Sequence, residues 1–299
     1  MLQRNVNPGH KSLSKFKLLI LGAGYSGQAI ARFGKSAGYE IICSRRDIGK
    51  EGTDIVFNSS KLQIPNFNDL NDITHLISCI PPDENGKDPV LDLLEENLKI
   101  LPLQWVGYLS TTGVYGDYGG NWVTEENATK PEQARSKRRL SCEKAWLESG
   151  LPIQILRLPG IYGPGRSAVD GLKKGQSKMI DKPGQVFSRI HVDDIAGALF
   201  HLIILADNGI MPKIVNIADS LPSSNLEVLK YAASLIGKTL PPIESFETAK
   251  KNMSPMALSF WQENRKVSNE LLCNKLGYKL LYPTYKSGLQ SCIKENQLN

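Results

Sequence analysis

A short apolar strand, a glycine-rich turn and an amphipathic helix follow one another near the start of the chain, and this succession strongly constrains the fold. Residues 17–22 read KLLILG, the turn continues as AGYSG to residue 27, and QAIARFGKSAG follows with apolar residues at helical spacing. The glycines match G-x-G-x-x-G, in which they permit a tight turn, a close main-chain approach to a diphosphate and close helix packing. Free N–H groups at the helix start then face the phosphates. Although such turns also serve packing alone, this context predicts a dinucleotide-binding unit.

The second predicted strand ends in arginines. It spans residues 39–43 (YEIIC) and runs into Ser44, Arg45 and Arg46, where an acidic residue about twenty positions past the glycines would hold the ribose hydroxyls of NAD. A guanidinium instead pairs well with a ribose 2′-phosphate. The sequence therefore favours NADP over NAD as the cofactor. The alternative is that Arg45 and Arg46 are solvated loop charges.

Further strand-like segments recur along the chain, with helical or turn segments between most of them. They lie at 54–58, 74–80, 104–110, 152–157 and 213–217. This alternation predicts an α/β fold of the Rossmann type, with a doubly wound parallel sheet. Prolines at 81 and 82 end the segment 74–80 and place the chain at the carboxyl rim of the sheet, where open α/β sheets hold ligands.

The pattern changes to helices and loops from about Leu221, and prolines become frequent there. A length of 299 residues suits one large α/β domain with a smaller lobe. We therefore expect a flexible tail at 1–16, an NAD(P)-binding Rossmann domain at 17–220 and a smaller, mostly helical substrate lobe at 221–299.

Composition and charge limit the classes of molecule that we expect this protein to bind. A net charge of +6 suits an anionic small molecule but falls short of the basic footprint of nucleic-acid binding. The five cysteines are widely spaced without a CxxC pair, so neither a disulfide framework nor a metal site is indicated. The longest apolar stretches, such as 198–206, are too short for a membrane helix. We expect a cytoplasmic protein that binds neither membrane nor nucleic acid.

Four segments together resemble the extended short-chain dehydrogenase/reductase family, the NAD(P)-dependent epimerase/dehydratase group, and are most similar to its atypical members. The segments are STTGVYG at 110–116, RLPGIYGPGR at 157–166, RIHVDDIA at 189–196 and VNIAD at 215–219. The resemblance implies a Rossmann domain with the nicotinamide near the ends of the strands before Thr111 and Pro159. It also implies a serine or threonine that orients the substrate oxygen, a tyrosine that exchanges its proton, and a lysine that holds the nicotinamide ribose.

The match assigns these roles residue by residue. Thr111 falls on the hydroxyl position and Lys137 on the lysine position, but Gln133 stands where the tyrosine belongs. A carboxamide does not titrate, so Gln133 cannot be an acid or a base, although it can donate a hydrogen bond to an oxyanion. The residues expected at the cofactor are Gly22, Gly24, Tyr25, Ser26, Gly27, Ser44, Arg45, Arg46, Pro81, Lys137, Pro159 and Ile161.

Helical spacing provides a check on this alignment. If 132–148 is a helix, Gln133 and Lys137 share a face with Leu140 and Leu147, which we interpret as the inward face. The opposite face carries Arg135, Arg138, Arg139 and Cys142. We expect the arginines to form a solvated or subunit-facing surface, with binding of an acidic substrate or partner as the alternative.

Four other residues are candidates for the substrate side of the site. Tyr115 and His191 could exchange protons with the substrate. The simpler interpretation of Tyr115 is that it packs in the core. The simpler interpretation of His191 is that it is a structural residue near the start of a helix that Asp193 or Asp194 caps. Tyr162 and Arg166 lie in the IYGPGR loop, where Arg166 could hold a carboxylate or phosphate.

Two functions follow from these assignments. The favoured one is an oxidoreductase or epimerase-like enzyme that uses NADP on a small, anionic substrate without the usual tyrosine. The alternative is a protein that binds NADP(H) without turnover and serves as a redox sensor or assembly component. A homodimer is compatible with either function.

Overall fold

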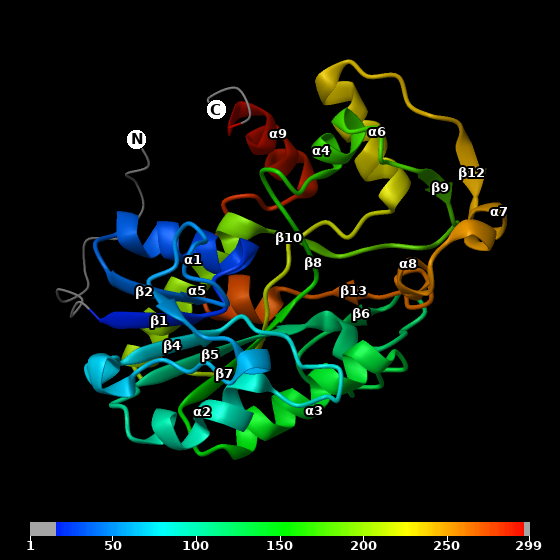
Figure 1. Cartoon of the computed structure of the whole chain (residues 1–299). Coiled ribbons are helices and arrows are strands. Elements are labelled where there is room, and N and C mark those ends of the chain that lie inside the picture. Colours follow the sequence, from blue (N-terminus) through cyan, green and yellow to red (C-terminus); the bar gives the residue numbers. More distant parts are fainter. Residues whose placement is uncertain (1–15, 296–299) are drawn as a thin grey trace.

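The computed structural model describes residues 16–295 and contains one central sheet of seven parallel strands (Figure 1). In the order of their pairing, the strands are β11 (Ile214–Asn216), β7 (Ile153–Leu158), β5 (Trp105–Thr111), β4 (His75–Ser78), β1 (Lys17–Leu21), β2 (Glu40–Arg45) and β3 (Ile55–Val56). The predicted Rossmann-type sheet is confirmed, and each predicted strand is present near its predicted bounds. The strand order reverses at β1, so the crevice between the ends of β1 and β4 is the expected ligand position.

Helices cover both faces of the sheet. α1 (Tyr25–Ser36) and α5 (Val192–Asp207) pack on one face, and α2 (Pro89–Lys99) and α3 (Ala134–Glu148) pack on the other (Figure 1). An apolar core lies on each face of the sheet, and alternate residues of β1 point into one core or the other. Ile20 lies in the core beneath α1 and α5, whereas Leu19 lies in the core beneath α2 and α3. This two-sided burial explains why the central strands read as continuous apolar runs.

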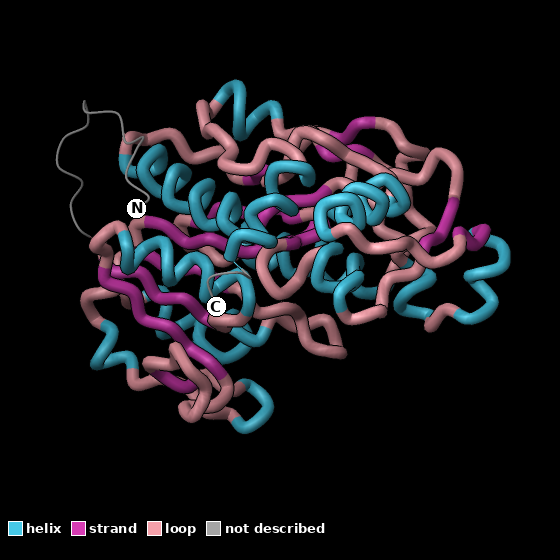
Figure 2. The backbone as a smooth tube through the Cα atoms, turned by 90° about the horizontal axis from the view of Figure 1, so that it is seen from above, coloured by secondary structure: helices cyan, strands magenta, loops and turns pink. Residues whose placement is uncertain are grey.

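A smaller lobe lies beside the sheet (Figures 1 and 2). Its helices and paired strands are α4 (Ala168–Lys173), β9 (Met179–Asp181), α6 (Asn225–Ile236), β12 (Ile243–Ser245), α7 (Phe246–Ala249), α8 (Pro255–Ser259) and α9 (Tyr285–Glu295). The core of the lobe is formed by α4, α6 and α9, which contribute Leu172, Leu229 and Leu289. This lobe begins earlier in the chain, at α4, than the helical lobe predicted at 221–299.

Short elements connect the two lobes. β8 (Gly160–Tyr162) pairs with β10 (Arg189–His191), and β6 (Trp122–Val123) pairs with β13 (Lys266–Val267). Short 3-10 turns are η1 (Ser59–Lys61), η2 (Phe67–Leu70), η3 (Thr112–Tyr115) and η4 (Lys250–Asn252), and η5 (Leu271–Lys275) is a π-helical turn. Over residues 16–295, no helix is long and apolar enough to cross a membrane.

Each lobe contains segments from both predicted ranges, so the single boundary predicted after residue 220 is wrong. Val169 and Met179 come from the predicted Rossmann range but lie in the core of the smaller lobe. Leu272 and Tyr278 come from the predicted substrate lobe but lie in the core of the sheet. Phe16, assigned to the tail, is buried and stacks on Tyr39 and His75, while residues 1–15 lie outside the described part of the chain.

Candidate functional site

In the glycine turn after β1, each of the three glycines has its own steric surroundings. Gly22 has φ +79°, and a Cβ there would lie 2.5 Å from Ile80 Cγ1, so the turn accepts only glycine without strain. A Cβ on Gly27 would lie 3.2 Å from Ile20 Cγ2, which reflects the close packing of α1 on β1. Gly24 is exposed, and a Cβ there would come no closer than 3.9 Å to another atom. The open space in front of Gly24, at the start of α1, fits an approaching phosphate group.

Ser44 and the two arginines after it differ in how deeply their side chains are buried. Ser44 is fully buried; its hydroxyl accepts a hydrogen bond from Gly22 N at 3.1 Å, and its carbonyl accepts one from Ala23 N at 2.8 Å. The side chain of Ser44 therefore holds the glycine turn, and the predicted direct contact with the cofactor is wrong for it. Arg45 is half-buried and Arg46 is exposed at the end of β2, so Arg46 is the more accessible cation beside the turn.

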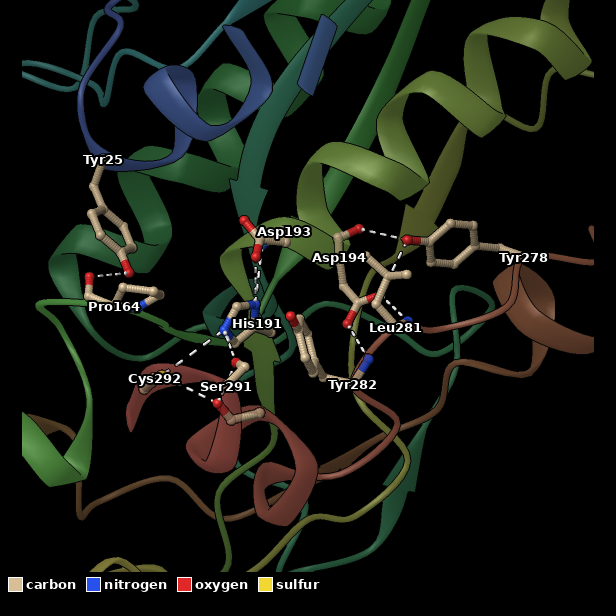
Figure 3. A network of polar contacts seen from close by, with 11 residues as sticks. Tyr25, Pro164, His191, Asp193, Asp194, Tyr278, Leu281, Tyr282, Ser291 and Cys292 are labelled. Atoms are coloured by element: carbon tan, nitrogen blue, oxygen red, sulfur yellow. Dashed lines mark hydrogen bonds and ion pairs between the residues drawn. The ribbon is translucent and has the colours of Figure 1, made fainter. Parts of the chain in front are cut away.

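A loop from the other side of the crevice reaches the glycine turn. The Tyr25 hydroxyl donates to Pro164 O at 3.1 Å (Figure 3), and the Arg166 guanidinium carbon lies 5.6 Å from the centre of the Tyr25 ring. Burial raises the pKa of Tyr25, so its phenol stays protonated and serves as a donor at neutral pH. The IYGPGR loop therefore packs against the first residue of α1, directly beside the glycine turn.

Three further predicted cofactor residues follow strands of the sheet, and a fourth lies in α1. Pro81 follows β4 and is exposed, while Pro159 follows β7 and Ile161 lies in β8, both half-buried. Ser26 is half-buried in the first turn of α1. Their positions match the crevice, and their contacts with a cofactor stay a prediction.

Thr111 is the last residue of β5. Its Oγ1 accepts a hydrogen bond from Gly113 N at 3.1 Å and thereby caps η3. A Cβ on Gly113 would lie 2.7 Å from Ser136 Oγ and 3.4 Å from Thr111 Oγ1. The first turn of α3, which carries Ser136, therefore packs directly against the Thr111 turn.

The orientation predicted for α3 is wrong. Gln133 precedes the helix, and its amide nitrogen donates to Gln262 Oε1 at 2.8 Å. Lys137 is exposed, whereas Arg139 lies on β5 and donates from Nη1 to Leu109 O at 2.8 Å and to the Tyr108 hydroxyl at 3.2 Å. The buried residues of the helix are Ser136, Cys142, Glu143 and Trp146.

Burial of the largest side chain decides this orientation. Trp146 is fully buried and donates from Nε1 to Asp88 Oδ2 at 2.9 Å. The helix therefore turns the face with Cys142 and Trp146 inward, and Leu140 and Leu147 remain half-buried at its flanks. The spacing of Trp146 with Cys142 and Arg139 was the signal in the sequence that would have identified this face.

A buried ion pair lies under α3, and sequence reasoning missed it. Arg157 of β7 donates from Nη2 to Glu143 Oε2 at 2.7 Å, and both side chains are at most 3% exposed. The Ser110 hydroxyl donates to Glu143 Oε1 at 2.5 Å, and the Arg157 guanidinium lies 4.8 Å from the Tyr115 ring centre. An arginine within the apolar run IQILRL was the signal, because a buried charge requires a partner.

Tyr115 and His191 are structural residues, so their predicted roles on the substrate side are wrong. Tyr115 is fully buried and donates to Asn216 Oδ1 at 2.8 Å. His191 is fully buried and caps α5 by accepting from Asp193 N at Nδ1, 3.2 Å away (Figure 3). Burial lowers the pKa of His191 to about 4, which keeps the ring neutral as a capping acceptor.

Asp194 does not cap α5 but holds the segment that leads from the core of the sheet into α9 of the smaller lobe. Its carboxylate accepts from the main-chain N–H groups of Leu281 at 2.7 Å and Tyr282 at 2.9 Å, and from the Tyr278 hydroxyl at 3.1 Å (Figure 3). Burial raises the pKa of Asp194 to about 6 despite these bonds. This clamp fixes the smaller lobe against the start of α5.

A cavity of about 410 Å³ lies in the smaller lobe. Two of the predicted substrate residues, Tyr162 and Arg166, line it, as do two further cationic residues, Lys178 and Arg189. Arg189 donates from Nη1 to Phe187 O and Ser223 O, and apolar walls come from Trp261 and Leu229, among others. Arg166 also lies over the ring of Tyr25, so one residue that lines the cavity contacts the residue that follows Gly24. In the described part of the chain, no cluster of acidic, histidine or cysteine side chains could hold a metal ion.

Asp219 lies near this cavity and predicts a measurable pH dependence. Burial raises the pKa of Asp219 to about 7, which the Leu221 N–H bond and Arg189 only partly offset. The folded state therefore keeps a proton between about pH 4 and pH 7 that the unfolded state releases, and stability falls as pH rises through that window. We expect the unfolding free energy of Asp219→Asn, relative to the wild type, to rise by up to about 1.4 kcal/mol per pH unit there.

Urea unfolding of both proteins from pH 4.5 to 8 measures this difference. Subtraction removes the opposite contributions of His75 and His191, whose pKa values burial lowers to about 4. A difference between the two proteins that does not change with pH would contradict the raised pKa of Asp219.

Comparisons with known proteins extend this picture. No protein-family model matches the chain. The protein YeeZ of Escherichia coli K12 is 27% identical over 180 residues, which cover 59% of this chain and 58% of YeeZ. The chain thus matches just over half the length of this curated relative.

Solved structures match over nearly the full length. A functionally unknown protein from Silicibacter pomeroyi is 37% identical, with a TM-score of 0.84 over 94% of this chain and 99% of its own. A structure described as a putative NAD-dependent epimerase/dehydratase from Methylobacillus flagellatus is 25% identical, with a TM-score of 0.72 over 95% of this chain and 100% of its own.

More distant structures share the fold and hold cofactors. The dTDP-glucose 4,6-dehydratase of Bacillus anthracis, in complex with NAD, is 20% identical, with a TM-score of 0.72 over 95% of this chain and 97% of its own. The human epimerase family protein SDR39U1, with NADPH, is 17% identical, with a TM-score of 0.71 over 93% of this chain and 99% of its own. The glycine turn, the parallel sheet and these full-length matches together show that the chain has the fold of the NAD(P)-dependent epimerase/dehydratase proteins of the extended short-chain dehydrogenase/reductase type, which its sequence motifs resemble.

Proposed function

We propose that the protein is an NADP-dependent oxidoreductase of the epimerase/dehydratase type that acts on a small anionic substrate. One observation carries the proposal: Arg166 both lines the cationic cavity and lies beside Tyr25 of the glycine turn. An anion in the cavity would therefore lie next to a cofactor held by the turn. Arg166, Lys178 and Arg189 supply the charge, and a guanidinium suits a carboxylate or a phosphate.

The cofactor side of the proposal rests on residues around β1 and β2. The open backbone at Gly24 would receive the diphosphate, and Arg46 would pair with a 2′-phosphate. The nicotinamide would supply hydride transfer at the carboxyl edge of the sheet. Relatives of the same fold hold NAD in one case and NADPH in another, so the preference for NADP depends on the arginines of this chain.

The chemistry of the protein itself depends on Thr111. Its hydroxyl would orient the reacting oxygen of the substrate by a hydrogen bond. Gln133 does not titrate, and its amide nitrogen is bonded to Gln262, so its contribution is limited to hydrogen bonding. The enzyme would therefore depend on orientation and charge stabilisation more than on a side-chain acid.

The cofactor preference is a testable prediction. We expect wild-type protein to bind NADPH more tightly than NADH, and Arg46→Ala to lose about tenfold to about a hundredfold in NADPH affinity, because a charged hydrogen bond is removed. Fluorescence titration of the reduced nicotinamide measures both constants. Lys50→Ala, another exposed charge in the same loop, is the matched control and should leave both constants unchanged. Equal affinities for NADPH and NADH in the wild type would contradict the preference.

Turnover distinguishes this enzyme from the non-catalytic alternative. The observation that favours a redox sensor or assembly component is Gln133, a residue without acid–base chemistry at the position that the sequence match assigns to the family's tyrosine. We would screen small carbonyl compounds that carry a carboxylate or phosphate, following nicotinamide absorbance, with Thr111→Ala beside the wild type. Wild-type turnover that Thr111→Ala abolishes supports the enzyme. Tight NADPH binding without turnover on any compound would favour the sensor.

A further inference from the structure

The position of Arg139 suggests a different cofactor contact from α3. The guanidinium lies against β5, with Nη1 bonded to Leu109 O at 2.8 Å and to the Tyr108 hydroxyl at 3.2 Å. Leu109 is two residues before Thr111, so Arg139 lies close to the reacting end of the strand. Lys137, two residues earlier in the helix, is exposed.

The charge of Arg139 also lies near the end of the neighbouring strand. Cys79 directly follows β4, and burial raises the pKa of its thiol to about 12, an effect that the nearby charge of Arg139 opposes. β4 and β1 are neighbours at the switch point of the sheet. A cation that influences the ends of both β4 and β5 lies beside the crevice that receives a cofactor in sheets of this topology.

The spacing along α3 supports the same assignment. Arg135 precedes Arg139 by four residues, which is the interval between the tyrosine and the lysine in the family. The guanidinium of Arg135 lies 3.8 Å from the centre of the Phe260 ring, in the segment whose next residue, Trp261, lines the cavity. The two arginines therefore run along α3 from the cavity side toward the strand ends.

We propose that Arg139, rather than Lys137, is the residue of α3 that positions the nicotinamide ribose. This inference rests on the proposed function, because it requires that the crevice bind a nicotinamide cofactor. A guanidinium has five N–H donors, and Nη1 makes the two bonds to β5, so Nη2 and Nε would supply the hydrogen bonds to ribose hydroxyls. The shifted frame also places Arg135, instead of Gln133, at the tyrosine position, where a permanent cation would bind an anionic group rather than transfer a proton.

The test compares NADPH affinity in Arg139→Met and Lys137→Met by fluorescence titration, with no substrate present. We expect Arg139→Met to weaken binding by about tenfold to about a hundredfold and Lys137→Met to bind like the wild type. Arg139→Lys keeps the cation and should recover most of the affinity, whereas a purely structural role would lower the melting temperature without changing the dissociation constant of the folded protein.

The affinities of the wild type and the variants distinguish failure of this inference from failure of the proposed function. Unchanged NADPH affinity in Arg139→Met, or an equal loss in Lys137→Met, overturns this inference alone. A wild-type protein that binds neither NADPH nor NADH overturns the proposed function and this inference with it. If Arg139→Met does not fold, Arg139→Gln removes the charge while keeping hydrogen-bond donors, and the same comparison with Lys137→Met decides.

Discussion

Replacement of Glu143 by alanine is expected to lower the free energy of unfolding by about 3–5 kcal/mol. The substitution leaves the Arg157 guanidinium buried at 3% exposure without the carboxylate that accepts its Nε and Nη2 bonds. It also removes the acceptor of the Ser110 hydroxyl. An uncompensated buried charge is far more costly than the loss of an average hydrogen bond. Urea unfolding followed by circular dichroism measures the change.

Two further variants show whether the charge is the cause. Glu148→Ala removes an exposed carboxylate from the same helix and should change the free energy of unfolding by no more than about 0.5 kcal/mol. The double variant Glu143→Met/Arg157→Leu removes both charges and should recover much of the loss, because an apolar pair of similar volume can replace a buried ion pair. A small effect of Glu143→Ala, comparable to that of Glu148→Ala, would mean that water solvates Arg157.

The second large effect is expected at Gly24. Gly24→Ala should leave the folded protein almost as stable as the wild type, because the added Cβ would come no closer than 3.9 Å to another protein atom. The same methyl group would occupy the space through which the main chain approaches the diphosphate. We expect affinity for NADPH to fall at least about tenfold, which corresponds to about 1.4 kcal/mol. Titration and thermal unfolding of the same sample separate the two effects.

Gly22→Ala is the matched control within the same turn. Here the added Cβ would lie 2.5 Å from Ile80 Cγ1 on a residue with φ +79°, so the variant should lose stability as well as affinity. A Gly24→Ala protein that binds NADPH normally would contradict the assignment of this turn to the cofactor.

Much of the fold was predictable because local pattern and tertiary structure agree there. The apolar run before Gly22 forms β1, and the spacing of the glycines matches a turn in which each one has a separate steric reason. The strands at 104–110 and 152–157 were recognisable because burial on both faces requires continuous apolar residues. The cofactor contacts predicted for the turn follow from main-chain shape, which glycine dictates directly.

The face of α3 was not predictable in the same way. Leu140 and Leu147 suggested one inward face, whereas the helix buries Cys142 and Trp146 and directs Arg139 toward β5. A helix with few apolar residues has no single clear stripe, so the partner surface decides its rotation. That surface includes Asp88, which accepts from Trp146 Nε1, and Glu143 turns inward with the same face toward Arg157.

By itself, the sequence determined the parallel sheet, the glycine turn and the presence of arginines after the second strand, because each of these depends on neighbours in the chain. Only the tertiary structure decided that Tyr115 and His191 are buried structural residues, that Arg166 lines the cavity and contacts Tyr25, and that Arg139 lies against the sheet while Lys137 is exposed. The physical reason is that a side chain's role depends on which distant segment packs against it, and burial of residues such as Trp146 settles that packing over the whole molecule.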